Sequence, residues 1–359
     1  MKIAQLDAQR AWRGGEQQVL YLSQALRAHG CYNVTICQPD GALYQRACQA
    51  HVPVHGLRVR HEVDVVAAWQ LARYLRREQI DILHMHDPHG HTIGLLACVL
   101  APQVRKVVSR RVDFAPIRNW FSRWKYKMSG VQYLAVSEAV RRVMINSGIP
   151  GTQVQTIHSG IDPNLGQDVP AAEPLFPPGT RMVGTVGHLA GHKGQGTLLE
   201  ATRLLIRDEP KLGVAIVGTG ALRQRLEAQA ADLGIAEHVQ FTGFRHDVPS
   251  LIQAFEIFVF PSYLEGLGTS VLDAMALGKP VVATSAGGIP ETVQDGITGL
   301  LVPPRDPVAL AQAIRYLLQH PELQAQFGKA GRQRVEQAFT AQRMAQQTMQ
   351  VYHQLMHAN

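Results

Sequence analysis

The sequence has few of the residues that mark disulfide-stabilised or zinc-binding proteins. Its 359 residues include four cysteines, all in the first third of the chain: Cys31, Cys37, Cys48 and Cys98. None of them forms a C-x-x-C pair. Scattered thiols in apolar or mixed surroundings are typical of buried, reduced side chains in cytosolic proteins.

Long hydrophobic runs and a cleavable leader are missing as well. The stretch from Met1 to Asp7 lacks the apolar core of a signal peptide. The longest apolar run, Ile93 to Ala101, is much shorter than the roughly 20 residues that a membrane-spanning helix needs. We therefore expect a cytoplasmic protein without a membrane span.

The charge balance is moderate and slightly basic. Charged residues make up 18% and hydrophobic residues 46% of the chain, which fits a folded globular protein. The net charge of +7 favours an anionic partner such as a nucleotide diphosphate, an anionic lipid surface or nucleic acid, although a mildly basic enzyme without such a partner has the same balance. The length is comfortable for two domains.

Short β-rich runs alternate with amphipathic helical stretches along the whole chain. The first set of predicted strands is Lys2–Leu6, Asn33–Cys37, Ile80–Met85, Lys106–Ser109, Gln132–Val136 and Val154–Ile157. The second set is Arg181–Val186, Gly213–Val217, Val239–Phe241, Ile257–Phe260, Pro280–Ala283 and Leu300–Val302. Such alternation predicts parallel sheets with helices on both faces.

The fold class expected from this pattern is α/β, with two doubly wound Rossmann-like domains that face each other across a cleft. A Pro-rich stretch, 169–178, is the candidate linker between an N-terminal domain, 1–168, and a C-terminal domain, 179–338. Apolar residues at helical spacing predict a last helix within 339–359 that packs back on the N-terminal domain.

The most informative segment is Glu265 to Asp273, which follows the apolar strand Ile257–Phe260 and opens a helix. The free N–H groups at a helix start bind phosphate, and the helix dipole adds to the attraction. Glu265 and Asp273 cannot bind phosphate, but carboxylates accept hydrogen bonds from sugar hydroxyls. The segment therefore predicts a site for a nucleotide sugar.

Two further strand ends carry glycine turns. Gly14-Gly15 follows the first strand without forming G-x-G-x-x-G, so the dinucleotide fingerprint is absent there, and the pair is either a ligand-binding turn or simply a tight turn. Gly187 to Gly194 follows the first strand of the second domain and places Lys193 just before a helix, where its charge can meet a phosphate. A solvated loop lysine is the plainer interpretation.

Histidines cluster after the fourth strand of the first domain, at His84, His86, His89 and His91. His84 and His86 face the same side of a strand, but a zinc site would need a third ligand of fixed geometry. We favour a role for His86 in hydrogen bonding to a sugar hydroxyl, with His89 and His91 as capping or solvated side chains.

A basic, tryptophan-rich stripe lies at 117–128 and includes Trp120, Phe121 and Trp124. Such a helix can lie in the interface of an anionic membrane, at the inner face of the cytoplasmic membrane in a cytoplasmic protein. The alternative is a helix that packs on the sheet with a solvated basic rim.

Together these motifs resemble the retaining family-4 glycosyltransferases of the two-domain GT-B fold. The resemblance rests on Gly14-Gly15-Glu16, His84-Met85-His86, Ala135 to Glu138, Ser159 to Asp162, Gly187 to Gly194, Glu265 to Asp273 and Gly287 to Glu291, which occur in the family's order across most of the chain.

The resemblance implies a role for each of these positions. Glu265 and His86 would be the catalytic residues that contact the donor sugar. The donor-binding residues would be Gly14, Gly15, His188, Lys193, Gly266, Leu267, Gly268, Thr269 and Asp273. No metal or cofactor is implied. The family usually has Glu at Asp273 and Arg at His188, and the second change removes a permanent bidentate charge.

The predicted function is retaining transfer of a hexose-type sugar from a nucleotide diphosphate sugar to an acceptor hydroxyl. The acceptor suggested by the family is an envelope glycolipid or lipopolysaccharide core, and no nucleic-acid partner is expected. One alternative is a soluble small-sugar glycosyltransferase or synthase of the same fold. An NAD-dependent oxidoreductase is disfavoured by the missing G-x-G-x-x-G, and a non-catalytic nucleotide-sugar binder is suggested only by His188 and Asp273.

Overall fold

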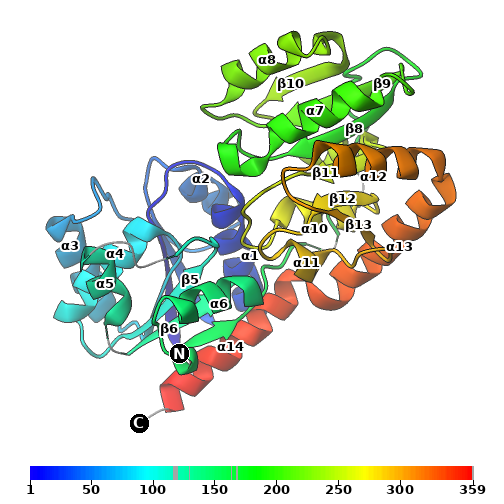
Figure 1. Ribbon diagram of the computed structural model, residues 1–359. Helices are drawn as coiled ribbons and strands as arrows, with labels where there is room; N and C mark the ends of the chain where they lie inside the picture. The colour runs from blue at the N-terminus through cyan, green and yellow to red at the C-terminus, as the bar shows by residue number, and fades with distance from the viewer. Residues whose placement is uncertain (116–119, 129, 163, 167–168, 358–359) are drawn as a thin grey trace. The chain divides into compact units, whose positions relative to one another are not determined.

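A computed structural model gives the structure of the protein and describes residues 1–115, 120–128, 130–162, 164–166 and 169–357. The chain forms two compact units: unit 1 comprises 1–160 with 340–359, and unit 2 comprises 161–339 (Figure 1). The divisions therefore fall at 160/161 and 339/340, and the Pro-rich stretch 169–178 belongs to unit 2.

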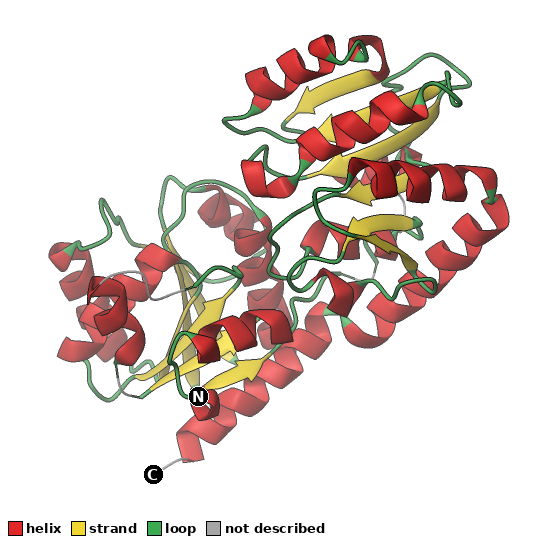
Figure 2. Ribbon diagram, viewed as in Figure 1, coloured by secondary structure: helices red, strands yellow, loops and turns green. Residues whose placement is uncertain are grey.

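The described residues of unit 1 form a sheet of seven parallel strands in the order β3-β2-β1-β4-β5-β6-β7. Its strands are β1 (Lys2–Asp7), β2 (Tyr32–Cys37), β3 (Val54–Gly56), β4 (Ile82–Met85), β5 (Arg105–Arg110), β6 (Val131–Ala135) and β7 (Val154–Thr156). Its helices are α1 (Gly14–Ala28), α2 (Ala42–Gln49), α3 (Val65–Arg77), α4 (Pro88–Leu100), α5 (Trp120–Lys127), α6 (Glu138–Asn146) and α14 (Ala341–His357). Figure 2 shows the helices covering the strands.

The last helix, α14, packs on unit 1, as expected from its apolar spacing. Met344, Ala345 and Val351 join the core formed by β1, β4 and α1. Tyr352 is fully buried there, and its hydroxyl contacts Gln5 Nε2 at 3.2 Å and His84 Nδ1 at 2.6 Å. These contacts confirm the predicted return of the C-terminal helix.

Unit 2 repeats the same pattern with six parallel strands among its described residues, in the order β10-β9-β8-β11-β12-β13. They are β8 (Arg181–Val186), β9 (Leu212–Val217), β10 (Val239–Gly243), β11 (Ile257–Phe260), β12 (Val281–Thr284) and β13 (Gly299–Val302). The helices are α7 (Gln195–Leu205), α8 (Arg223–Asp232), α9 (Val248–Ala254), α10 (Thr269–Ala276), α11 (Ile289–Thr292), α12 (Pro307–Gln319) and α13 (Pro321–Ala338).

The predicted doubly wound class is therefore confirmed in both units. Each of the twelve predicted strands has a counterpart, but β3 and α2 were not foreseen. β3 is an edge strand of three residues, too short to show alternation. α2 begins directly after Gly41, which provides no side-chain cap, so the sequence carries no strong start signal.

The basic stripe at 117–128 is described only in part. Residues 116–119 and the side chains of Trp120 and Phe121 lie outside the described part of the chain. Trp124 is 39% exposed. Lys125, expected on the solvated rim, is buried, and its Nζ donates to the Pro88 carbonyl at 2.6 Å. Lys125 Nζ also pairs with Glu62 Oε1 at 3.5 Å, so the buried ammonium group has both a backbone and a carboxylate partner.

Replacing Tyr352 with phenylalanine tests how α14 is attached. The substitution leaves His84 and Gln5 each short of a buried partner, so we expect unit 1 to lose about 1–3 kcal/mol of stability. All four tryptophans, at 12, 69, 120 and 124, lie in unit 1, so their fluorescence in a urea titration follows that unit. Tyr32→Phe, which alters a tyrosine that is 48% exposed, is the control, and equal stability of both variants would contradict the attachment.

Candidate active site

Both sheets reverse their strand order between the first and fourth strands. In unit 2 the pair is β8 and β11, and in unit 1 it is β1 and β4. Ligands of doubly wound sheets bind beyond the carboxyl ends of the strands at this switch point, because the two following loops diverge there. The predicted site residues lie on or beside these four loops.

In unit 2 the loops after β8 and β11 are held together by backbone contacts. Tyr263 N donates to the His192 carbonyl at 2.6 Å. Gly194 has a φ of 69°, and a Cβ at this position would lie 1.9 Å from the Pro261 carbonyl oxygen. Only glycine allows this approach, so Gly194 fixes the loop that carries Lys193 against the loop that carries Glu265.

Lys193 and Glu265 form an ion pair at this junction. Lys193 Nζ lies 2.5 Å from Glu265 Oε2, and the two side chains are 20% and 14% exposed. Lys193 also lies over the ring of Phe260, at 5.5 Å from its centroid. Gly288 N donates to the Glu265 carbonyl at 3.0 Å, so the loop after β12 supports the same residue. The pair places an ammonium donor and a carboxylate acceptor side by side.

The start of α10 lies directly after Glu265. Gly268 has a φ of 87° and is the residue that precedes the helix, a left-handed conformation that favours glycine. The first N–H groups of a helix have no partner within the helix. Leu267 is buried and anchors this turn in the core, while Gly266 and Thr269 flank it.

Asp273 lies one turn into α10. Its Oδ1 is buried and has no hydrogen-bond partner among the described residues. Burial raises the pKa of Asp273 from 3.8 to about 7. A buried polar atom without a partner costs free energy, so this carboxyl oxygen is poised for a donor that the protein does not supply.

His188 follows β8 and is exposed, and its carbonyl accepts from Gln195 Nε2 at 3.1 Å. A Cβ at the neighbouring Gly187 would meet no described atom within 4 Å, so packing does not demand glycine there. His192, on the same loop, is exposed too. Arg110 belongs to unit 1, where it donates to Tyr126 and to the Phe114 carbonyl.

In unit 1, Asp87 ties the two switch-point loops together. Its carboxylate accepts hydrogen bonds from Ala8 N at 2.8 Å and from Gln9 Nε2 at 2.9 Å. Ala8 and Gln9 are the first two residues after β1. It also accepts from His89 N and Gly90 N and so caps α4, which follows β4. A single side chain thus fixes both loops.

A chain of hydrogen bonds runs inward from this point. Arg111 Nη2 lies 2.9 Å from His86 Nδ1, and His86 Nε2 lies 2.6 Å from Gln5 Oε1. Because a guanidinium can only donate, His86 Nδ1 must accept, and His86 Nε2 must carry the proton that it donates to Gln5. Gln5 Nε2 then donates to the Tyr352 hydroxyl, which is left to donate to His84 Nδ1.

The direction of this chain defines the state of His86. Both of its ring nitrogens have protein partners, and the residue is 6% exposed. Burial, with His84 and Arg111 nearby, lowers the pKa of His86 well below its usual value, so the imidazole is neutral. A hydrogen bond from His86 to a sugar hydroxyl would require one of these contacts to change, and it stays a prediction.

Gly14 opens α1, and Gly15 follows it. A Cβ on Gly15 would meet no described atom within 4 Å, and Gly15 does not have a positive φ. Neither packing within the described residues nor backbone strain therefore requires glycine at Gly15. This openness is the feature expected of a glycine that lets a ligand approach the backbone.

Sequence reasoning missed the charged residues around His86. Arg111 is surrounded by Asp7, Glu16 and Asp87, and burial together with the other two carboxylates raises the pKa of Asp7 well above its usual value. A signal was present in the first strand, which contains the polar residues Gln5 and Asp7. Central strands of a parallel sheet are normally apolar throughout, so these two residues indicate a buried polar site. Within the described ranges, no group of three or more His, Cys, Asp or Glu is placed to hold a metal ion.

Comparison with solved structures places the fold. The Anabaena protein Alr3699/HepE, crystallised with UDP and glucose, matches with a TM-score of 0.87 over 99% of this chain and 100% of that chain, at 22% identity. Sucrose-phosphate synthase from Thermosynechococcus elongatus matches with a TM-score of 0.80 over 100% of both chains, at 22% identity. These likenesses define the GT-B class of two Rossmann-like domains.

Sequence comparison gives the family. The Glycosyltransferase Family 4 profile matches residues 12–165, and the profile of glycosyl transferases group 1 matches residues 170–334. EpsD of Bacillus subtilis (strain 168), assigned as a glycosyltransferase, is 31% identical over 300 residues, which cover 77% of this chain and 78% of EpsD. The chain belongs to glycosyltransferase family 4, and it is an enzyme that transfers a sugar from a nucleotide sugar.

A second relative matches over a shorter span. The GDP-mannose-dependent alpha-(1-6)-phosphatidylinositol monomannoside mannosyltransferase of Mycolicibacterium smegmatis is 40% identical over 156 residues. The match covers 41% of this chain and 41% of that relative. Among the described residues, no helix is both long and apolar enough to cross a membrane.

Replacing Asp273 with asparagine should change how stability depends on pH. The pKa of Asp273 is higher in the folded protein than in the unfolded chain, so protonation favours folding, and the parent loses stability as the pH rises from about 4 to 7. Asparagine does not titrate, so the stability of the variant should increase relative to that of the parent over this pH range, by no more than about 4 kcal/mol.

Calorimetric unfolding between pH 4 and pH 8 measures this difference. Asp232→Asn, on an exposed position of α8, is the matched control. A constant difference between Asp273→Asn and the parent across the range would show that the carboxyl group is not buried in the way described.

Proposed function

We propose that the protein is a retaining, metal-independent glycosyltransferase whose unit 2 binds the nucleotide diphosphate sugar through the Lys193–Glu265 junction and the start of α10. The observation that carries this proposal is the placement of an ammonium group, a carboxylate and a helix start at one switch point. An ammonium and free N–H groups suit a diphosphate, and a carboxylate suits sugar hydroxyls.

Each donor part has a counterpart in this arrangement. Lys193 and the N–H groups near Thr269 would neutralise the diphosphate as it leaves, in place of a metal ion. Glu265 would orient the sugar through its hydroxyls. Asp273 Oδ1, buried without a partner, would accept from a ribose hydroxyl, which supplies the donor that the protein lacks.

Retention would follow from attack on the same face as the departing diphosphate. A leaving phosphate oxygen can accept the proton of the acceptor hydroxyl, so no protein nucleophile is required. In unit 1, Arg111 and Gln5 hold His86 as a neutral imidazole, and a hydrogen bond from His86 to a sugar hydroxyl would replace one of these two contacts. Gly15 would let the substrate approach the backbone.

The proposed acceptor is the hydroxyl group of an envelope glycolipid, reached at the inner face of the cytoplasmic membrane. The support is the mannosyltransferase relative that acts on a phosphatidylinositol mannoside, together with the exposed Trp124 in the basic stripe. Sedimentation with anionic vesicles tests the membrane contact, and a protein that stays in the supernatant would favour a small soluble acceptor.

Substituting Glu265 and Lys193 tests the donor site. A thermal-shift panel of UDP-, GDP- and ADP-sugars first identifies the donor. Glu265→Gln and Lys193→Ala should then each lower kcat/KM about 100-fold or more, because each removes a group that acts on developing charge or on sugar orientation. Donor hydrolysis and transfer are both measured.

Glu227→Gln is the matched control. Glu227 also pairs with a basic residue, Arg223, at 2.8 Å, but on the exposed surface of α8. The kcat/KM of Glu227→Gln should equal that of the parent. Full activity in Glu265→Gln would overturn the assignment of the donor site.

A further inference from the structure

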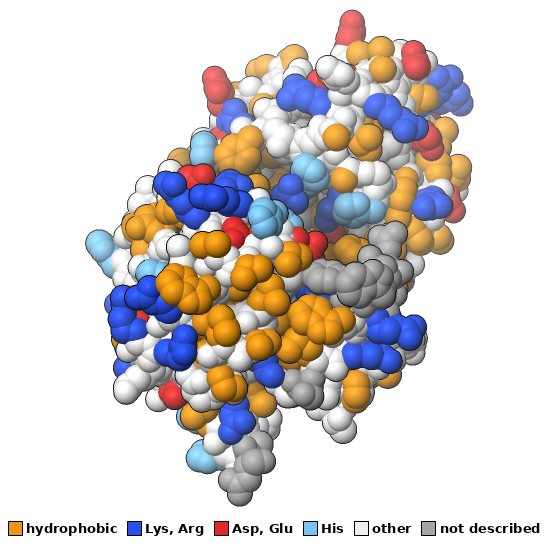
Figure 3. Space-filling model, turned by 90° about the vertical axis from the view of Figure 1, so that its left-hand side faces the viewer, with side chains coloured by type: hydrophobic (Ala, Val, Ile, Leu, Met, Phe, Trp, Pro, Cys, Tyr) orange, Lys and Arg blue, Asp and Glu red, His pale blue; other side chains and the backbone are white. Residues whose placement is uncertain are grey.

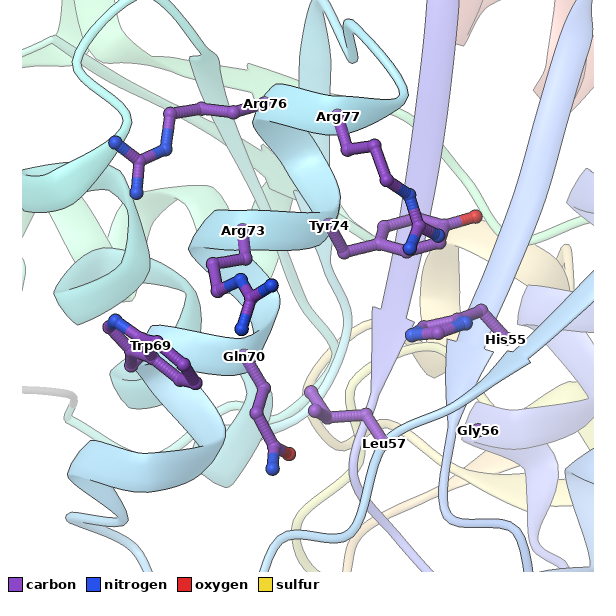
Figure 4. A pocket seen from close by; sticks show the side chains of 9 residues that line it. All are labelled: His55, Gly56, Leu57, Trp69, Gln70, Arg73, Tyr74, Arg76 and Arg77. Atoms are coloured by element: carbon purple, nitrogen blue, oxygen red, sulfur yellow. The ribbon is translucent and has the colours of Figure 1, made fainter.

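A basic, aromatic groove lies on unit 1 apart from the loops described above. It has a volume of about 540 Å³ and is lined by residues of β3, the following turn and α3 (Figure 4). Its basic end, at Arg76 and Arg77, lies near the amino ends of the strands, since the next residue, Glu78, accepts through its carbonyl from Lys2 at the start of β1. Its other end, at Gly56 and Leu57, reaches the carboxyl ends of the strands, because Gly56 pairs with Cys37 and Cys37 pairs with Asp7 at the end of β1.

One wall of the groove is formed by His55, Tyr74 and Arg77. The rings of His55 and Tyr74 lie 3.9 Å apart and 20° from parallel, and the Arg77 guanidinium lies 5.6 Å from the centre of the Tyr74 ring (Figure 4). Burial, with Arg77 nearby, lowers the pKa of His55, so the positive charge of this wall comes from the arginine.

A second stack orders Arg73, whose guanidinium lies 4.7 Å from the centre of the Trp69 ring. An aromatic face fixes the plane of a guanidinium but leaves its N–H edge free to donate. Two of the three arginines that line the groove are thus held in place before any ligand arrives, which lowers the entropy lost on binding.

These arginines have few acidic partners. Arg77 Nε pairs with Glu78 Oε1 at 2.9 Å, and the two terminal nitrogens of Arg77 take no part in this ion pair. Within the part of the chain that the structure describes, Arg73 and Arg76 form no ion pair with an acidic side chain. Figure 4 shows Arg73 between Arg76 and Arg77, whose side chains extend to opposite sides, so Arg73 is the central basic group of the groove.

Apolar surface borders this charge. Trp69 is 47% exposed, and Val65 and Val66, one turn earlier in α3, are 69% and 66% exposed. The side of the molecule on which α3 lies in Figure 1 faces the viewer in Figure 3, where hydrophobic side chains lie among Lys and Arg. The groove can therefore hold an anion that is attached to a less polar group.

We propose that this groove is a second ligand site, which binds a phosphate ester through Arg73 together with its neighbour Arg76 or Arg77. A phosphate presents several acceptor oxygens and a double charge, which suits planar guanidinium donors better than a single carboxylate does. The volume is within the range of small-molecule sites and leaves room for a sugar or glycerol group against Tyr74 and Gln70.

Pyrophosphate titration of the full-length protein, followed by tryptophan fluorescence, tests the proposal. Trp69 lines the groove, so the parent should give a saturable change that Trp69→Phe abolishes. The double variant Arg73→Glu/Arg76→Glu should bind roughly tenfold more weakly or worse, because it removes two charged donors. Lys193→Ala should keep the signal, which separates this site from the proposed donor site.

The double variant Arg207→Glu/Arg225→Glu is the control, because it makes the same change in charge at exposed arginines of unit 2. It should titrate like the parent. A parent-like titration of Arg73→Glu/Arg76→Glu would overturn the proposal. So would equal competition by polyglutamate, which would indicate a general acidic-peptide surface.

Vesicles distinguish the source of the phosphate. The groove takes a lipid head group if the parent binds phosphatidylglycerol vesicles but not phosphatidylcholine vesicles, and if the Arg73→Glu/Arg76→Glu variant no longer binds phosphatidylglycerol vesicles. If pyrophosphate binds and neither vesicle does, it takes a free phosphate ester. Both results support the site, and a variant that matches the parent with every probe excludes it.

Discussion

In each sheet the first strand lies between the second strand and the fourth. The positions of the candidate site residues follow from this strand order. Since all strands are parallel, every loop that leaves a carboxyl end rises at the same edge. Because the first and fourth strands are hydrogen-bonded neighbours, the loops that follow them lie side by side. Lys193 reaches Glu265 in unit 2, and Asp87 joins Ala8 in unit 1, for this same reason.

The two units use the switch point in different ways. In unit 2 a cation, a carboxylate and a helix start are partly exposed and suit a charged ligand. In unit 1 the polar groups are turned inward, and Arg111 sets the direction of a hydrogen-bond chain that keeps His86 neutral. The charged side chains at the switch point of unit 2 are thus partly exposed, whereas the imidazole at the switch point of unit 1 is buried and neutral.

Sequence patterns predicted the fold class and the family because these depend on local signals: apolar runs, glycine turns and strand–helix alternation. The segment from Glu265 to Asp273 was recognisable since it combines all three. Contacts between distant segments were not predictable in this way. Arg111 looked like any basic loop residue, and only the structure shows that it meets the end of β4 at His86. The groove beside β3 escaped notice because its arginines carry no motif.

Unit 1 is built from two pieces of the chain that are separated by the whole of unit 2. During synthesis on the ribosome, unit 2 has all of its residues before Tyr352 emerges, whereas β1 and β4 were made long before. Until then Gln5 and His84 lack the hydroxyl that joins them, and the core that α14 covers stays open. The first unit therefore completes its core only after unit 2 has been synthesised, and until then its open core is exposed to aggregation or to chaperone binding.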